Sequence, residues 1–124
     1  MKMPRTILVV EDDKWLYEQY ERLLSADGYK VLTTQHALAA IKIIDDVKPD
    51  AIILDVLLTG STAFTLLHEL QSYGDTGAIP IILCTNIASE LSLDDLKPYG
   101  VVQILDKSKM LPGDLVTSLR DVLT

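Results

Sequence analysis

The sequence predicts an α/β fold in which a parallel sheet is covered by crossover helices. Short runs rich in β-branched residues alternate with longer segments whose apolar residues recur at helical spacing, and this alternation is typical of successive βα units. The chain has 124 residues, which is the usual size of a single domain. We therefore expect residues 1–124 to form one domain.

Five strands are expected, and their composition indicates their place in the sheet. The first, third and fourth runs are almost continuously apolar, as in central strands that are covered on both faces. The second run is more polar, which suits an edge of the sheet. The predicted strands are Thr6–Val10, Lys30–Thr34, Ala51–Leu54, Ile79–Cys84 and Val101–Leu105.

Helices are predicted where apolar residues recur every three or four positions, because this spacing places them on one face. The first helix is expected to end at Gly28, since glycine readily adopts the left-handed conformation that closes a helix. The periodic apolar positions of four helices are Leu16, Tyr20, Leu23 and Leu24; Leu38, Ile41 and Ile44; Ala63, Leu66, Leu67 and Leu70; and Leu115, Leu119, Val122 and Leu123.

Residues that favour helix ends indicate where the third helix starts and where a further, fourth helix ends. Ser61 or Thr62 is expected to cap the third helix, because a hydroxyl oxygen can accept a hydrogen bond from a backbone N–H of the first turn. The fourth helix, about Ser89–Lys97, is expected to be short and polar. Pro98 and Gly100 are expected to end it.

The charge of the chain argues against nucleic-acid and membrane partners. It has 18 acidic and 11 basic side chains, a formal net charge of −7 and a pI of about 4.6, so it repels phosphate backbones and anionic lipid surfaces. Its start does not resemble a signal peptide, no apolar run is long enough to span a bilayer, and the one cysteine, Cys84, cannot form an internal disulfide. We therefore expect a cytoplasmic domain that binds neither nucleic acid nor membrane directly.

Charged and hydroxyl side chains follow four of the five predicted strands. Ligands of open parallel sheets bind outside the carboxyl ends of the strands, which meet at one edge. Side chains that are far apart in the sequence are therefore expected to gather there. They are Glu11, Asp12 and Asp13 after the first strand, Asp55 after the third, Thr85 after the fourth, and Asp106 and Lys107 after the fifth.

Carboxylates gathered in this way repel one another unless a cation neutralises them. Mg²⁺ is the natural candidate, because it prefers hard oxygen ligands and keeps water positions that a phosphate can replace. With the metal ion and Lys107 withdrawing charge from a phosphoryl group, Asp55 is placed to act as a nucleophile and to form an aspartyl phosphate. Thr85 is placed to donate a hydrogen bond to a phosphoryl oxygen.

Each of these residues also has an ordinary structural explanation. Acidic residues after strands are often helix caps or solvated loop residues, and Asp13, directly before the first helix, is expected to be an N-cap. Their conjunction favours a functional site, because loop charges without a role need not fall at four strand ends.

Three segments resemble motifs of the receiver domain of bacterial two-component response regulators, and the resemblance extends over the whole chain. Residues 7–13 (ILVVEDD) resemble the receiver opening, and residues 49–55 (PDAIILD) resemble the segment that ends in the phosphoacceptor. Residues 79–85 (IPIILCT) resemble the fourth strand with its switch hydroxyl. The resemblance implies a CheY-like, flavodoxin-like fold, with a five-stranded parallel sheet in the order 2-1-3-4-5 and helices on both faces.

The resemblance also implies a function. A sensor histidine kinase or a histidine phosphotransfer protein would donate a phosphoryl group to Asp55, and Thr85 and Lys107 would contact that group. The metal site implied by the resemblance holds Mg²⁺ and consists of Asp55, of Asp12 binding directly, of Glu11 binding mostly through water, and of the backbone carbonyl of Leu57.

Two other functions compete with this one. A phosphatase of the haloacid dehalogenase type needs a second acid two residues after its nucleophile, and Leu57 occupies that position, so the chain is not expected to be an enzyme. The alternative that remains is a receiver-like interaction module that signals without phosphorylation, because Ile104, Ser108 and Asn86 differ from the residues usual in the family. Neither function identifies a downstream protein partner.

Overall fold

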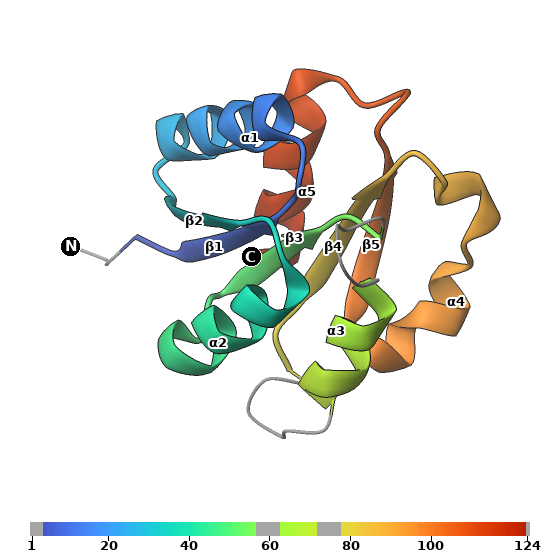
Figure 1. Ribbon diagram of the computed structural model, residues 1–124. Coiled ribbons are helices and arrows are strands. Elements are labelled where there is room, and N and C mark those ends of the chain that lie inside the picture. Colours follow the sequence, from blue (N-terminus) through green and yellow to red (C-terminus); the bar gives the residue numbers. More distant parts are fainter. Residues whose placement is uncertain (1–3, 57–62, 72–77, 124) are drawn as a thin grey trace.

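Five parallel strands form one sheet, shown in Figure 1. A computed structural model of the chain describes residues 4–56, 63–71 and 78–123. The strands are β1 (Thr6–Val10), β2 (Lys30–Thr34), β3 (Ala51–Leu54), β4 (Ile81–Thr85) and β5 (Val101–Asp106). They lie in the order β2-β1-β3-β4-β5. The predicted fold class, the strand order and the edge position of β2 are confirmed.

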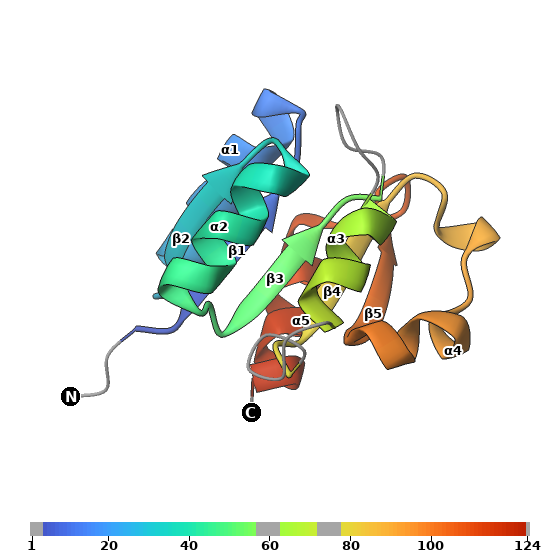
Figure 2. The same ribbon diagram turned by 60° about the horizontal axis from the view of Figure 1, so that its bottom comes forward.

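Helices cover both faces of this sheet. They are α1 (Lys14–Ala26), α2 (Ala37–Val47), α3 (Ala63–Gln71), α4 (Leu93–Leu96) and α5 (Pro112–Leu123), with two short 3₁₀ turns, η1 (Ala88–Glu90) and η2 (Lys97–Tyr99). Figure 2 shows α2 and α3 in front of the sheet and α4 beside β5, whereas α1 and α5 lie behind the sheet. Leu96 of α4 joins the same core as α2 and α3. None of the described helices is long and apolar enough to span a membrane.

The two faces of the sheet pack into separate apolar cores. Side chains alternate along β1, so Leu8 and Val10 join the core under α2 and α3, while Ile7 and Val9 join the core under α1 and α5. β3 and β4 are buried along their whole length, and β1 is buried from Ile7 onward. Their nearly continuous apolar composition follows from this double cover.

Helix α1 ends in the left-handed turn that the sequence predicts at Gly28. The φ angle of Gly28 is 94°. Its N–H donates to the carbonyl oxygen of Ser25, and the N–H of Tyr29 donates to that of Leu24, both at 3.1 Å. This pair of bonds is a Schellman motif, which satisfies two carbonyl oxygens of the last turn and directs the chain into β2.

The fourth and fifth strands differ slightly from their predicted bounds. β4 begins at Ile81 rather than at Ile79, because Pro80 has no N–H with which to enter the hydrogen-bonded ladder. Both strands extend one residue farther than predicted, to Thr85 and Asp106, and these two residues pair with each other. The pairing carries the ladder up to the edge where the charged side chains gather.

The predicted fourth helix is wrong as a single element. The segment consists of η1, the one-turn helix α4 and η2, and Leu91 interrupts it with an extended backbone (φ −110°, ψ 147°). Ser92 begins α4 as its N-cap and accepts a hydrogen bond from the N–H of Asp95 at 3.4 Å. Pro98 lies inside η2 rather than beyond the helix, and Gly100 ends the segment at φ 88°.

The predicted inner face of α2 is also partly wrong. Leu38 is 79% exposed, and the side chains that face the core are those of Ala37, Ala40 and Ile44. Successive helical residues are about 100° apart around the axis, so a helix that buries Ala37 turns Leu38 toward the side. Small residues at 37 and 40 fill the inner positions instead.

The inner faces of α3 and α5 agree with the sequence. Leu66, Leu67 and Leu70 of α3 are buried, as are Leu115 and Leu119 of α5. The predicted caps Ser61 and Thr62, and the side chain of Ala63, lie outside the described residues.

Replacing Gly28 and Gly113 by alanine is expected to change stability in opposite directions. A Cβ at either position would meet nothing within 4 Å, so only the backbone decides. Gly28→Ala should lower the free energy of unfolding by about 1 kcal/mol, because an L residue is strained at positive φ. Gly113→Ala, within α5, should raise it by up to about 0.5 kcal/mol. Urea unfolding measures both, and a Gly28→Ala variant as stable as the parent would contradict the left-handed turn.

Candidate functional site

The predicted side chains meet where β1, β3, β4 and β5 end. Glu11 follows β1, Asp55 follows β3, Thr85 ends β4 and Lys107 follows β5. The ladder continues past the strands, because the N–H of Asp55 donates to the carbonyl oxygen of Val10 and the N–H of Lys107 to that of Thr85, each at 3.1 Å. The backbone therefore fixes where each side chain starts.

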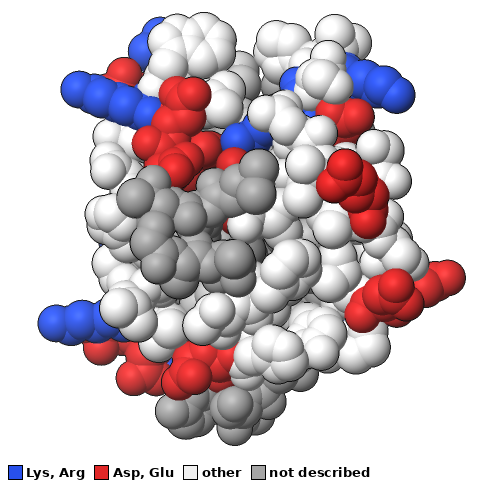
Figure 3. Space-filling view, turned by 45° about the vertical axis from the view of Figure 1, so that its right-hand side comes forward, with Lys and Arg blue, Asp and Glu red and all other residues white. Residues whose placement is uncertain are grey.

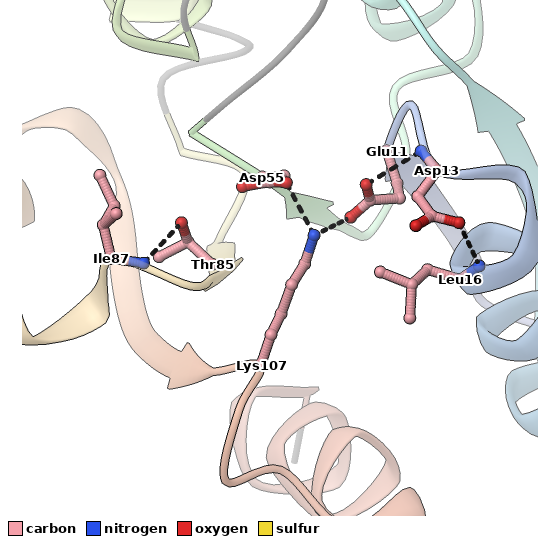
Figure 4. Close-up of polar contacts among 7 residues, drawn as sticks. All are labelled: Glu11, Asp13, Leu16, Asp55, Thr85, Ile87 and Lys107. Carbon is pink, nitrogen blue, oxygen red and sulfur yellow. Dashed lines mark hydrogen bonds and ion pairs between the residues drawn. The ribbon is translucent and has the colours of Figure 1, made fainter.

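An ammonium group bridges the two buried carboxylates, as Figure 4 shows. The Nζ atom of Lys107 lies 2.7 Å from Oδ2 of Asp55 and 2.6 Å from Oε2 of Glu11. All three side chains are less than 10% exposed. Buried charges are stable only when they are paired, so this contact offsets part of the cost of burying the two carboxyl groups.

Burial and pairing act in opposite directions on these groups. Burial raises the pKa of Glu11, although the hydrogen bond from Lys107 opposes this shift. Burial lowers the pKa of Lys107, but its hydrogen bonds to Asp55 and Glu11 more than offset that effect, so the pKa is raised. Lys107 therefore stays protonated at neutral pH and serves as the cation of the site.

Three carboxylates at this edge suit a hard divalent cation. One oxygen each from Glu11, Asp12 and Asp55 can be chosen so that all three lie within 4.8 Å of one another. Mg²⁺ takes hard oxygen ligands such as carboxylates, so these three residues fit such an ion. Glu11 and Asp55 are buried, whereas Asp12 reaches solvent. Leu57, the predicted fourth ligand, lies outside the described residues.

The hydroxyl oxygen of Thr85 accepts a hydrogen bond from the backbone. The residue is fully buried, and its Oγ1 accepts a hydrogen bond from the N–H of Ile87 at 3.3 Å. Because the oxygen is the acceptor in that bond, the hydroxyl can still donate one. In Figure 4, Asp55 lies between Thr85 on one side and Glu11 on the other, as the order β1-β3-β4 requires.

Two acidic residues at the same edge have structural roles instead. Asp13 is the N-cap of α1, as predicted, since its Oδ1 accepts from the N–H of Leu16 at 3.2 Å. The sequence did not indicate that the backbone N–H of Asp13 also donates to Oε1 of Glu11, at 3.1 Å. Asp106 does not join the acidic group, because its Oδ1 accepts two hydrogen bonds from Ser108.

The layer beneath the site carries no charge. Burial raises the pKa of the Cys84 thiol to about 12 and also raises the pKa of Tyr20 well above its ordinary value. Both side chains therefore remain protonated, and the hydroxyl of Tyr20 has no hydrogen-bond partner among the described residues. The charge of the site is confined to the edge of the sheet.

The surface in Figure 3 mixes acidic and basic side chains. Among the described residues on this face, no continuous basic area is visible.

Comparisons with known proteins agree on one family. A family model described as "Response regulator receiver domain" matches residues 7–120. The chain is 32% identical over 117 residues to the response regulator MprA of Mycobacterium sp. (strain KMS), covering 88% of this chain and 51% of that protein. It is 30% identical over 113 residues to MprA of Mycobacterium ulcerans (strain Agy99), covering 85% of this chain and 49% of that one. This chain thus spans about half the length of these relatives.

Solved structures have the same fold. The crystal structure of a candidate response regulator from Chloroflexus aurantiacus J-10-fl superposes with a TM-score of 0.84 at 30% identity, covering 97% of this chain and 98% of that one. The receiver domain of the sensor histidine kinase PA1611 from Pseudomonas aeruginosa PAO1 superposes with a TM-score of 0.86 at 22% identity, covering 97% and 98%.

The raised pKa of Glu11 predicts a pH dependence of stability in the absence of divalent cations. The folded domain binds the Glu11 proton more tightly than the unfolded chain does, so ionisation of Glu11 removes stability as the pH rises above its ordinary value of 4.5. Glu11→Gln cannot ionise and escapes this loss. The free energy of unfolding of Glu11→Gln, relative to the parent, should therefore increase between about pH 4 and pH 7.

Urea unfolding at several pH values in the presence of a chelator measures this difference. The control is Glu90→Gln, because Glu90 is exposed on η1. A difference between Glu11→Gln and the parent that stays constant with pH would contradict the raised pKa.

Proposed function

This chain belongs to the response regulator receiver domain family, and we propose that Asp55 is the residue on which it accepts a phosphoryl group. Receiver domains are the phosphoacceptors of two-component signalling. The observation that carries the proposal is the position of the Lys107 ammonium, 2.7 Å from Asp55 and 2.6 Å from Glu11 at the carboxyl edge of the sheet. The proposal concerns this domain, residues 1–124.

The carboxylate of Asp55 is the nucleophile of the proposed reaction. One of its oxygens forms a bond to phosphorus, while the bond from phosphorus to the donor breaks and its electron pair leaves with the donor atom. Lys107 pairs with a phosphoryl oxygen, because its ammonium already lies at Asp55 and keeps its charge when buried. Thr85 donates its hydroxyl hydrogen to a second phosphoryl oxygen. These contacts favour the transition state, in which negative charge is spread over those oxygens.

Glu11, Asp12 and Asp55 would hold Mg²⁺, together with the backbone carbonyl of Leu57. When bound, the ion supplies positive charge to the oxygens of the phosphoryl group. The donor set supports this assignment, since it consists of carboxylate oxygens that converge at one point. The PA1611 receiver domain is described with a magnesium ion coordinated in its active-site cleft.

The proposed phosphoryl donor is a sensor histidine kinase or a histidine phosphotransfer protein, and the proposed place of reaction is the cytoplasm. The relatives support this partner class, because they include response regulators and the receiver domain of a sensor histidine kinase. Such a donor carries phosphohistidine, so the bond that breaks is the one between phosphorus and nitrogen. The alternative, a module that signals without phosphorylation, gains no support. The proposed nucleophile and the charged groups that phosphoryl transfer needs lie together.

Asp55→Asn should abolish formation of the phosphorylated protein. The domain, incubated with Mg²⁺ and a small acyl phosphate, should gain the mass of one phosphoryl group in intact-mass spectrometry. An amide is too weak a nucleophile to replace the carboxylate. The matched control is Asp50→Asn, because Asp50 lies at the opposite end of β3, where its Oδ2 accepts from the N–H of Thr6 at 2.7 Å. Unchanged labelling of Asp55→Asn, or loss of labelling in Asp50→Asn, would reject Asp55 as the acceptor.

Mg²⁺ should stabilise the domain by mass action. At a concentration one hundred times its Kd, an ion that binds only the folded state adds about 2.7 kcal/mol. Asp12→Ala should remove most of this gain, whereas Asp94→Ala, at the exposed surface of α4, should retain it. Thermal unfolding with and without Mg²⁺ measures the gain, and equal stabilisation of parent and Asp12→Ala would show that the ion binds elsewhere.

A further inference from the structure

The position of Lys107 requires an explanation beyond its two ion pairs. Its side chain starts beyond the end of β5 and reaches past β4 to carboxylates that follow β3 and β1. A lysine side chain is long and has many rotamers, so holding it in one of them costs conformational entropy. Its backbone must therefore be fixed if the ammonium is to stay at Asp55.

The backbone before Lys107 is fixed by β4. Asp106 pairs with Thr85 in the ladder, and the N–H of Lys107 donates to the carbonyl oxygen of Thr85 at 3.1 Å. This side of the residue is therefore part of the sheet.

The backbone after Lys107 is fixed by Asp106, whose side chain accepts hydrogen bonds from the residue that follows Lys107. Oδ1 of Asp106 accepts from the N–H of Ser108 at 2.9 Å and from its hydroxyl at 2.6 Å. The carbonyl oxygen of Asp106 accepts from the N–H of Lys109 at 3.1 Å. The hydrogen bonds from the Ser108 side chain and backbone also lower the pKa of Asp106, so the carboxylate accepts them in its charged form, in which such bonds are strongest.

We propose that Asp106 and Ser108 form a clamp around Lys107 that keeps its ammonium at Asp55 and Glu11, which makes Asp106 and Ser108 positioning residues for phosphoryl transfer. β4 holds the backbone before Lys107, and the clamp holds the backbone after it. A misplacement of about 1 Å at a reacting centre can cost on the order of a hundredfold in rate. A looser turn should therefore slow the transfer without altering the metal ligands.

The chain offers a matched control at Asp114, seven residues after Lys107. Oδ2 of Asp114 accepts from the N–H of Leu111 at 2.8 Å, so it is another carboxylate bonded to a backbone N–H of the same connection. This bond does not span Lys107. Asp114→Ala therefore tests the effect of removing such a bond in general, and Asp106→Ala tests the clamp.

The first experiment measures phosphorylation by acetyl phosphate as a function of donor and Mg²⁺ concentration; this measurement rests on the proposed function. Asp106→Ala and Ser108→Ala should each lower the maximal rate about tenfold and leave the Mg²⁺ concentration for half-maximal rate unchanged. Ser108→Thr, which keeps both donors, should restore the rate, and Asp114→Ala should match the parent. Combined with Lys107→Ala, removal of Asp106 should have no further effect, because the two residues act together.

The second experiment needs no phosphorylation. In the domain labelled with ¹⁵N-lysine, the paired ammonium of Lys107 should give its own NMR signal, assigned by its loss in Lys107→Ala. The signal should broaden or disappear in Asp106→Ala and Ser108→Ala and persist in Asp114→Ala and Ser108→Thr. An unchanged Lys107 signal in both clamp variants would overturn the proposal, as would an equal loss of rate with and without Lys107. If the parent takes up no phosphoryl group, the proposed function fails, while the NMR result still decides the clamp.

Discussion

Two buried carboxylates at neighbouring strand ends are the constraint on which the rest of the site depends. β1 and β3 pair directly, so Glu11 and Asp55 cannot avoid each other. Both are nearly inaccessible to water, and their repulsion must be balanced from within the molecule. Lys107 provides the balance from β5, two strands away from β3. Because β4 and β5 extend to Thr85 and Asp106, Lys107 starts at the edge of the sheet where Glu11 and Asp55 lie.

Lys107 balances only part of the negative charge at the site. Glu11, Asp55 and Lys107 together leave one negative charge, and Asp12 adds a second at the solvent side. The phosphoryl group that we propose for Asp55 would bring more negative charge to the same place. Mg²⁺ held by these carboxylates would offset that charge, whereas the neutral protein layer beneath, with protonated Cys84 and Tyr20, cannot.

The sequence predicted the parts of the structure that follow from burial and from the direction of the strands. Central strands are apolar because both of their faces are covered. Charged residues at the carboxyl ends of parallel strands must share one edge, so the sequence predicts that Glu11, Asp55 and Lys107 lie together. The direction of a short acidic side chain does not follow from these rules. The sequence could not show that Asp106 bends back to Ser108 while Asp55 faces the site, because both follow strands.

The predictions for α2 and for the fourth helix failed for a related reason. Apolar residues three apart fit more than one rotation of α2, and the small residues Ala37 and Ala40, which mark its true inner face, carry little hydrophobic signal. In the segment after β4, a polar sequence has no strong preference between α and 3₁₀ turns. Leu91, where the segment is interrupted, packs partly buried against the core under α2 and α3, a long-range contact that the local sequence does not show.

That interrupted segment has a thermodynamic consequence. Between residues 86 and 100 only Leu96 is buried, and the turns are short, so this cover opens locally at a lower free energy than α1 or α5 and its amides should exchange with deuterium sooner. It is also joined to the site, because the N–H of Ile87 depends on Oγ1 of Thr85 for its hydrogen bond. If the hydroxyl turns toward another partner, the bond to Ile87 changes. Where opening costs little, so small a change suffices to redistribute the population of conformations.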